Sequence, residues 1–296
     1  MVNPPDVYVS PALGGEERCI LRLNPWLDRR IRSQPEPLTV TSPDGRLIDA
    51  WLIPPAGVVE PRPGPLVLDI HGGPHSTFGY AFFFDMQLLA TQGYSVLFVN
   101  PRATRGYGDD FALCNLGRWG EGDAPDLFAA LDAAIETGWV DPTRIGVTGL
   151  SYGGFMTNWL IGHSNRFRAA VSENCLSNLP SFYGTSDIGW YFAPAEIGGE
   201  PEEEAVRYAH ISPLSAAGSI TAPLLLLNGL EDWRCPIEQA EQIYTALKRR
   251  GRMVEMVCFP GESHVMLAEG RPRTRLVRCG HLLRWFATYL TAPTAP

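Results

Sequence analysis

The amino-acid sequence predicts an α/β fold with a mainly parallel, doubly wound sheet and helices on both of its faces. From about residue 46 onward, short runs rich in branched and aromatic residues alternate with segments whose apolar residues recur at helical spacing. The chain has 296 residues, of which 45% are hydrophobic, so it can bury a large core. One main domain is therefore expected.

Seven runs are predicted as strands and four segments as helices. The strands cover residues 47–53, 65–71, 94–100, 145–148, 167–173, 223–228 and 254–259. The helices cover residues 124–137, 152–163, 237–250 and 274–289. Asp141-Pro142 predicts the loop before the strand at 145–148, and Gly251 stands where glycine commonly ends a helix.

The first thirty residues have a different pattern. Residues 7–9 and 19–23 flank a turn with Gly14-Gly15, which predicts a β-hairpin. A two-stranded hairpin is at best marginally stable by itself, so it needs a partner. We therefore divide the chain into a hairpin and linker, residues 1–30, and the main α/β domain, residues 31–296, in which residues 293–296 are predicted to be frayed.

The composition argues against several classes of function. The net charge is -8 and basic residues form no sustained block, which argues against a nucleic-acid partner. No run approaches the roughly 18 apolar residues of a membrane helix, and residues 1–5 do not resemble a signal peptide, so a cytoplasmic protein without a membrane partner is predicted. The six cysteines form no C-x-x-C pair and are interpreted as buried thiols, and neither a cofactor nor a metal is predicted.

The segment Gly149-Leu150-Ser151-Tyr152-Gly153-Gly154 contains the pattern G-x-S-x-G between a predicted strand and a predicted helix. In that setting the pattern predicts a nucleophile elbow, because glycines permit the tight reversal that pushes a serine hydroxyl clear of the backbone. The sequence therefore predicts a serine hydrolase of the α/β-hydrolase fold, with Ser151 as the nucleophile.

A serine nucleophile needs a neutral imidazole to take its proton and an acid to orient that imidazole, and on this fold they follow in the order serine, acid, histidine. His264 lies in a loop directly after the last predicted strand, whereas the other histidines lie in less suitable positions. The strand at 223–228 is followed by Glu231 and Asp232. We predict Asp232 as the acid, and Glu231 suits an acidic turn before the next helix.

Acyl transfer also needs N–H donors for the developing oxyanion. The backbone N–H of Tyr152 is predicted as one donor from its place after the nucleophile. His71-Gly72-Gly73-Pro74 follows an early strand as an oxyanion loop does, so the N–H of Gly73 is predicted as the second donor. A plain tight turn is the alternative, and His71 is interpreted as a structural hydrogen-bonding residue.

Several motifs carry a resemblance to a known family. They are His71-Gly72-Gly73-Pro74, residues 100–108, Trp119-Gly120 with Asp123 and Asp126, residues 149–154, Asp232-Trp233-Arg234-Cys235-Pro236 and residues 261–264. Together they resemble the catalytic domain of the prolyl oligopeptidase family, acylaminoacyl-peptidase branch, over about residues 35–290. The resemblance implies the triad Ser151, Asp232 and His264.

The resemblance also implies substrate contacts. Arg234 would hold a substrate main-chain carbonyl with its guanidinium, for which a surface arginine after a turn is the alternative. Residues 182–192 lie where this fold inserts pocket-lining helices, so an apolar pocket is implied, with core packing as the alternative. Its predicted lining residues are Phe182, Tyr183, Trp190 and Phe192. Arg102 and Arg105 are interpreted as residues that brace a loop.

The front of the chain departs from the family pattern. Members carry an N-terminal β-propeller over the active site, whereas here only the hairpin precedes the hydrolase domain and resembles a remnant of such a propeller-like domain. Apolar surface left exposed around the active-site mouth would admit long peptides and would favour a homo-oligomer.

The leading prediction is a serine hydrolase that cleaves short peptides or acylated amino acids through an acyl-enzyme. Its partner is thus a peptide or small acyl substrate. A carboxylesterase acting on small acyl or aryl esters would use the same residues without peptide selectivity. A binding module without catalytic activity is a third hypothesis, which an intact triad and oxyanion loop disfavour.

Overall fold

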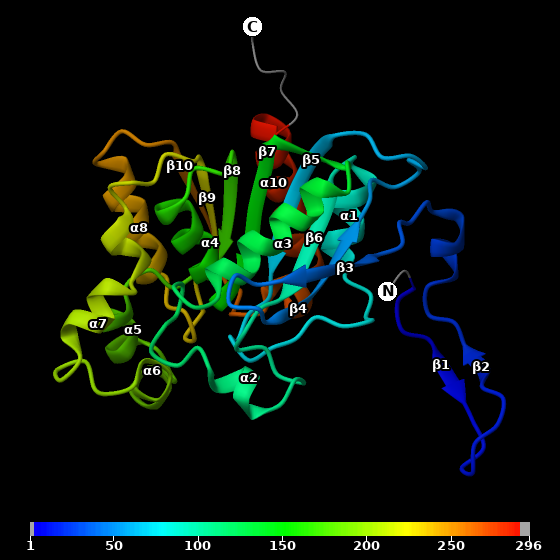
Figure 1. Ribbon diagram of the computed structural model, residues 1–296, viewed down its shortest axis with the longest axis horizontal. Helices are drawn as coiled ribbons and strands as arrows, with labels where there is room; N and C mark the ends of the chain where they lie inside the picture. The colour runs from blue at the N-terminus through cyan, green and yellow to red at the C-terminus, as the bar shows by residue number, and fades with distance from the viewer. Residues whose placement is uncertain (1–2, 291–296) are drawn as a thin grey trace, which may run out of the picture.

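A sheet of eight strands forms the centre of the computed structural model, which describes residues 3–290. The strand order is β10-β9-β8-β7-β5-β6-β4-β3 (Figure 1). The strands are β3 (Glu36–Thr41), β4 (Leu47–Ile53), β5 (Gly64–Ile70), β6 (Ser95–Asn100), β7 (Val140–Leu150), β8 (Ala169–Glu173), β9 (Leu224–Gly229) and β10 (Val254–Phe259). Strands β3, β4 and β6 pair antiparallel and all other pairs are parallel, so the predicted mainly parallel sheet is confirmed.

Helices cover both faces of this sheet. Helices α3 (Ala124–Glu136), α4 (Tyr152–His163) and α8 (Glu238–Lys248) pack on one face, and α1 (Phe84–Thr91) and α10 (Pro272–Leu290) pack on the other. Strand β5 shows why both faces are apolar: Leu66 and Leu68 belong to the core under α3 and α4, while Val67 belongs to the core under α1 and α10. The four predicted helices are all present, with ends shifted by at most two residues.

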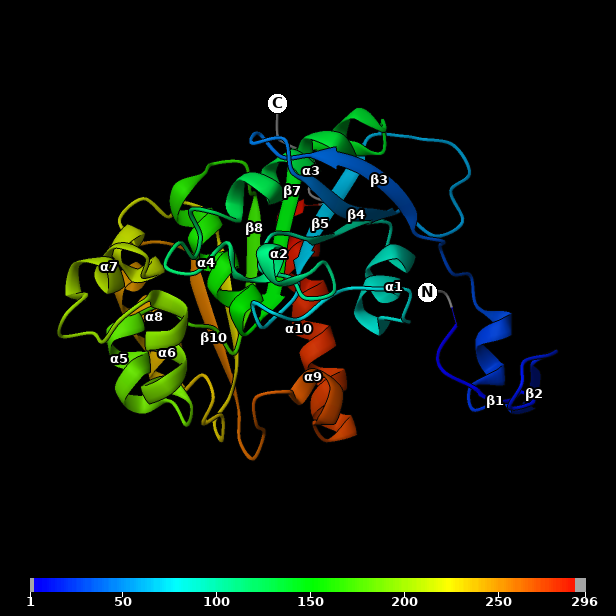
Figure 2. The same ribbon diagram turned by 60° about the horizontal axis from the view of Figure 1, so that its bottom comes forward.

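Shorter helices lie in the connections between the main elements of the fold. They are α2 (Asp109–Leu113), α5 (Leu179–Thr185), α6 (Gly189–Ile197), α7 (Ala205–His210), α9 (Met266–Glu269) and the 3₁₀ helix η2 (Pro213–Ala216). Helices α5, α6 and α7 lie together beside α8 in both views (Figures 1 and 2). Residues 182–192 therefore extend from α5 into α6, with residues 186–188 connecting the two helices.

The N-terminal segment forms a separate two-stranded sheet. Strands β1 (Val7–Val9) and β2 (Arg18–Leu21) pair antiparallel and stand apart from the central sheet in Figure 1. The 3₁₀ helix η1 (Pro25–Arg29) then leads toward β3. The hairpin exposes apolar side chains, among them Tyr8, Ile20 and Leu21. Its origin as a remnant of a propeller-like domain stays a prediction, and the predicted frayed end at 293–296 lies outside the described residues.

None of the helices within residues 3–290 combines the length and the apolar character that crossing a membrane requires.

Candidate active site

A sharp turn between β7 and α4 carries Ser151. Its backbone has φ 64° and ψ -119°, a strained combination for a residue with a side chain. The flanking glycines make this turn sterically feasible: a Cβ on Gly149 would lie 2.5 Å from the Gly153 carbonyl carbon, and a Cβ on Gly153 would lie 2.1 Å from the Ile70 carbonyl oxygen. The turn is fixed to the sheet because the Ser151 N–H donates to the Glu173 carbonyl at 3.0 Å.

The structure brings Ser151, His264 and Asp232 together from three loops at the carboxyl end of the sheet. The distance from His264 Nε2 to Ser151 Oγ is 3.0 Å, and that from His264 Nδ1 to Asp232 Oδ2 is 2.8 Å. Because a carboxylate only accepts, Nδ1–H donates to Asp232 and Nε2 is left to accept the serine proton. These contacts are the ones that nucleophilic activation of a serine requires.

Asp232 is held by its own loop. Its Oδ1 accepts the backbone N–H groups of Arg234 and Cys235, each at 2.8 Å, and its side chain is 0% exposed. Two N–H donors and the imidazole therefore compensate the buried carboxylate. Glu231 is exposed at the same turn and does not take this position.

Asn174 supports the histidine loop and was not predicted from the sequence. Its side-chain amide donates to the His264 carbonyl at 2.6 Å, and its oxygen accepts the N–H of Gly229 at 2.8 Å. The residue follows β8 with a positive φ of 39°. A polar residue directly after a parallel strand was the available signal, because functional side chains gather at the carboxyl ends of such strands.

The loop after β5 runs against the elbow: a Cβ on Gly72 would lie 3.5 Å from Ser151 Cβ. The imidazole of His71 contacts the Gly72 carbonyl through Nδ1 at 2.8 Å and the Thr104 hydroxyl through Nε2 at 2.9 Å. Burial lowers the pKa of His71 to about 4, so the ring is neutral and donates from Nδ1 to the Gly72 carbonyl. The Thr104 hydroxyl donates to the Pro101 carbonyl at 2.6 Å.

This contact orients the next peptide group. In a planar trans peptide the C=O and N–H point in opposite directions, so holding the Gly72 carbonyl also sets the direction of the Gly73 N–H. Across residues 3–290, neither the Gly73 N–H nor the Tyr152 N–H donates to a protein acceptor. Tyr152 is the first residue of α4, where backbone N–H groups lack helical partners. Both predicted donors are thus free to bind a substrate oxygen.

His75 and Glu196 anchor this loop to α6, and the sequence did not reveal the pair. His75 contacts the Ala103 carbonyl through Nδ1 and Glu196 Oε1 through Nε2, each at 2.8 Å. Glu196 also accepts the indole N–H of Trp119 at 3.3 Å. Because the two partners are 121 residues apart, no local spacing in the sequence connects them.

A buried ion pair and a buried hydrogen bond brace the neighbouring loops. Arg102 donates to Asp126 from Nε at 2.9 Å and from Nη2 at 2.7 Å, and both residues are buried. The Tyr152 hydroxyl donates to Asp123 at 2.5 Å, and burial raises the pKa of Asp123 to about 6. These contacts hold the loops on either side of the elbow.

Arg234 lies at the same turn as Asp232. Its Nε and Nη2 donate to Asp187 at 2.8 and 3.2 Å, and its side chain is 42% exposed. The hydrogen bond to Asp187 and its charge raise the pKa of Arg234, and the guanidinium lowers the pKa of Asp187. The guanidinium is therefore oriented by Asp187 at the turn that carries Asp232, and its contact with a substrate stays a prediction.

The four predicted pocket residues do not share one environment. Phe182 is 1% exposed and packs against Phe192 with ring centroids 6.5 Å apart, which is the core-packing alternative. Phe192 also contacts Trp119, with ring centroids 5.9 Å apart. Trp190 is 66% exposed, and Tyr183 is partly buried against the core. A substrate role for Tyr183, Trp190 and Phe192 stays a prediction.

The cysteines are free thiols, but only Cys175 and Cys235 are buried. The prediction of six buried thiols is therefore wrong for Cys19, Cys114, Cys258 and Cys279, which are only partly covered. Burial raises the pKa of Cys235 well above its usual value, so it remains a thiol although its Sγ is 3.9 Å from Ser151 Oγ. Within residues 3–290, no three His, Cys, Asp or Glu side chains are placed to hold a metal ion.

A serine, a histidine and an aspartate in this hydrogen-bonded order, on an elbow of a mainly parallel sheet, define the class of α/β-hydrolase-fold serine hydrolases. The model of the prolyl oligopeptidase family matches residues 80–292. The chain belongs to the prolyl oligopeptidase family.

Its relatives are longer peptidases. The uncharacterized peptidase YuxL of Bacillus subtilis (strain 168) is 41% identical over 293 residues, which are 97% of this chain and 44% of that protein. The acylamino-acid-releasing enzyme of Arabidopsis thaliana is 37% identical over 234 residues, which are 76% of this chain and 30% of that protein. The crystal structure of Pyrococcus horikoshii acylaminoacyl peptidase superposes with a TM-score of 0.93 at 35% identity, covering 100% of this chain and 48% of that one. This chain thus spans less than half the length of these relatives.

Proposed function

We propose that this chain is the catalytic domain of a serine peptidase that cleaves short peptides or acylated amino acids through an acyl-enzyme. The observation that carries the proposal is the chain of two hydrogen bonds from Asp232 through His264 to Ser151, at 2.8 and 3.0 Å. The names of the relatives, an acylamino-acid-releasing enzyme and an acylaminoacyl peptidase, support the choice of substrate class.

Each residue then has one task. Ser151 Oγ attacks the substrate carbonyl carbon while His264 Nε2 takes the hydroxyl proton and Asp232 stabilises the imidazolium. The N–H groups of Gly73 and Tyr152 bind the oxyanion. His264 next protonates the leaving amine, and the C–N bond breaks to give an ester on Ser151. A water molecule, deprotonated by His264, hydrolyses that ester and restores the serine.

The Arg234 position suggests how a peptide is told apart from a simple ester. Asp187 accepts hydrogen bonds from one edge of the Arg234 guanidinium and so fixes the orientation of the group. The other N–H groups of the guanidinium remain available as donors. A carbonyl of the acyl or peptide group beside the scissile bond is proposed to bind the remaining N–H groups. The second candidate function, a carboxylesterase, is favoured instead if the Arg234–Asp187 pair only braces the turn.

Arg234→Ala distinguishes these two functions. For an acetyl-amino-acid anilide we expect kcat/KM to fall. The fall should correspond to a loss of about 1.5 to 3 kcal/mol of transition-state stabilisation, as for loss of a charge-assisted hydrogen bond. For a short-chain nitrophenyl ester, which lacks the second carbonyl, kcat/KM should change little. Kinetics on both substrates and on a dipeptide anilide with a free amino group would measure this.

A matched control is Arg166→Ala, because Arg166 forms an exposed ion pair with Asp132 away from the active site. That variant should leave both substrates unaffected. Equal losses on anilide and ester in Arg234→Ala would favour the carboxylesterase, and hydrolysis of the ester alone by the unmodified chain would do so directly.

We also propose a cytoplasmic location, as the sequence suggested, and a homo-oligomer formed through exposed apolar surface. The exposed apolar side chains of the β1–β2 hairpin support the second point. The same segment supports the proposed boundary between a hairpin and linker, residues 1–30, and the catalytic domain, residues 31–296.

A further inference from the structure

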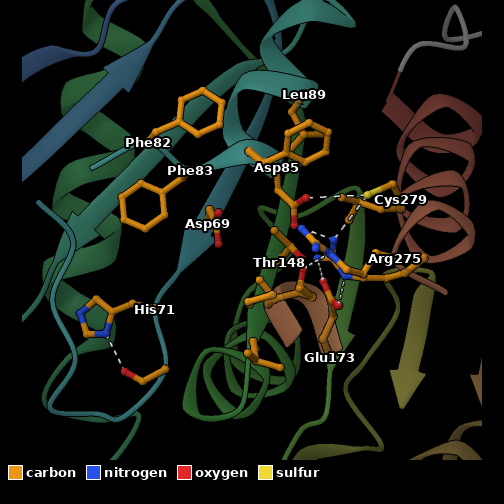
Figure 3. Close-up of a pocket in the computed structure, with 18 of the residues that line it drawn as sticks. Asp69, His71, Phe82, Phe83, Asp85, Leu89, Thr148, Glu173, Arg275 and Cys279 are labelled. Atoms are coloured by element: carbon orange, nitrogen blue, oxygen red, sulfur yellow. Dashed lines mark hydrogen bonds and ion pairs between the residues drawn. The ribbon is translucent and has the colours of Figure 1, made fainter. Parts of the chain in front are cut away.

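A cavity lies behind the elbow, on the face of the sheet that α1 and α10 cover. Its volume is about 890 Å³, and Gly72, Gly149 and Leu150 line it while Ser151, Asp232 and His264 do not. The cavity is therefore separate from the side of the elbow where the proposed reaction takes place. Figure 3 shows its polar wall, formed by Asp69, Thr148 and Glu173 from the central strands, facing Asp85 and Arg275 from the helices.

The strand register brings these polar groups into one place. Asp69 on β5 pairs with Thr148 on β7, and Glu173 ends β8 beside Leu150. Alternation along β5 places Asp69 on the same face as Val67, which belongs to the core under α1 and α10. Two carboxyl groups thus stand at positions that this fold normally fills with apolar side chains.

One of these carboxyl groups is paired and the other is not. Arg278 donates to Glu173 from Nε at 2.6 Å and from Nη2 at 2.5 Å, and its Nη1 lies 2.6 Å from Asp85 Oδ2. Within residues 3–290, no donor pairs with the carboxyl of Asp69, and the Thr148 hydroxyl is buried without a hydrogen-bond partner. An ionised Asp69 carboxylate can only accept, and the Thr148 hydroxyl can accept as well as donate, so a donating ligand can pair with both groups.

The charges around Asp69 favour a cation. Desolvation, together with the negative charges of Asp85 and Glu173, raises the pKa of Asp69 to about 7, although Arg278 acts in the opposite direction. Arg275, Cys279 and the neutral His71 complete the titratable groups of the lining. Since burial keeps Cys279 a thiol, Asp85 and Glu173 balance Arg275 and Arg278, and an ionised Asp69 gives the lining a net negative charge.

The rest of the lining is apolar and aromatic. In Figure 3, Phe82 lies above Asp69 and Phe83 lies to its left. Trp26, Leu267 and Leu276 belong to the same lining. Such surface binds a hydrocarbon or aromatic body, and aromatic faces also attract a cation. The site therefore combines a carboxyl group at its base with an apolar surround.

We propose that this cavity binds a primary ammonium group carried on an apolar body, with the ammonium donating to Asp69 and the body lying among Phe82, Phe83 and Leu276. Because Gly72 and Leu150 line the cavity, a bound amine would contact the oxyanion loop and the elbow on the side opposite the Ser151 hydroxyl. The inference concerns a ligand site and does not depend on the proposed peptidase activity.

Calorimetric titration of the 296-residue chain with 4-phenylbutylamine tests the proposal. At about pH 8.5, where Asp69 is ionised, we expect the amine to bind at least about ten times more tightly than 4-phenylbutan-1-ol and 4-phenylbutyrate, which keep the body but lack the ammonium. At about pH 5.5 the amine remains charged but Asp69 is protonated, so its affinity should fall on the order of tenfold.

Asp69→Asn keeps the shape of the side chain and should abolish the preference for the amine, whereas Asp132→Asn, an exposed aspartate on α3, should not. Binding should persist after Ser151 is blocked with diisopropyl fluorophosphate. Equal affinity for amine and alcohol, an unchanged preference in Asp69→Asn, no binding of the amine, or loss of binding on blocking Ser151 would each overturn the proposal. The last result would place the amine in the active site and leave the peptidase proposal intact.

Discussion

Ser151→Ala and His264→Ala are each expected to lower kcat for anilide hydrolysis by a factor on the order of 10⁴ to 10⁶. Ser151 Oγ is the proposed nucleophile, and without the imidazole at 3.0 Å nothing takes its proton as the new bond forms. Because the two groups act as one unit, the double variant should be only slightly worse than either single variant. Steady-state and burst kinetics on the three proteins measure both effects.

Two matched variants show whether these losses are specific. Ser164→Ala replaces the serine that follows α4, the helix that Ser151 precedes. His210→Ala removes an exposed histidine that pairs with Glu121. Both should retain near-normal kcat. Substantial activity in Ser151→Ala would refute the proposed nucleophile, and multiplicative losses in the double variant would refute the joint action of Ser151 and His264.

The fold was largely predictable because it depends on periodicity. Strands such as β4 and β10 are uninterrupted apolar or alternating runs, and their bounds agree with the prediction. Strand β3 was missed because Pro37 interrupts a short run, and a proline is tolerated there only because the strand lies at the sheet edge. Helix α1 was missed because its eight residues are too few to show a helical period and no side chain caps its start.

The candidate site also contains residues that the sequence could predict and residues that it could not. Ser151, Asp232 and His264 could be selected because each follows a predicted strand in a fixed chain order. The support of the site could not, because Asn174, His75 and Glu196 act through contacts between loops far apart in the sequence. Phe182 is 1% exposed and packs in the core, and the sequence alone cannot distinguish such an aromatic residue from one that lines a pocket.

Arg278→Met is expected to destabilise the folded chain by about 3 to 5 kcal/mol near pH 8. Arg278 and Glu173 are 3% and 2% exposed, and methionine preserves the apolar stem but leaves the carboxylates of Glu173 and Asp85 uncompensated. Urea denaturation, followed by tryptophan fluorescence, measures the free energy of unfolding.

The cost should depend on pH in a defined direction. Burial already raises the pKa of Glu173 despite Arg278, and removal of the guanidinium must raise it further. A carboxyl group with a raised folded-state pKa penalises folding little below its unfolded pKa, and the penalty grows as pH rises toward the folded-state value. The destabilisation should therefore be clearly smaller near pH 5 than near pH 8.

Glu173→Gln in the same chain separates charge from packing. The double variant Glu173→Gln with Arg278→Met should recover much of the lost stability near pH 8, because one of the two uncompensated carboxylates is gone. An equal cost at both pH values, with no recovery in the double variant, would mean that Arg278 contributes only by packing. The ion pair also bears on catalysis, because the Glu173 carbonyl accepts the Ser151 N–H at 3.0 Å. A chain that loses this pair should therefore lose hydrolytic activity on warming before its global unfolding, as the strand end that holds the nucleophile becomes free to move.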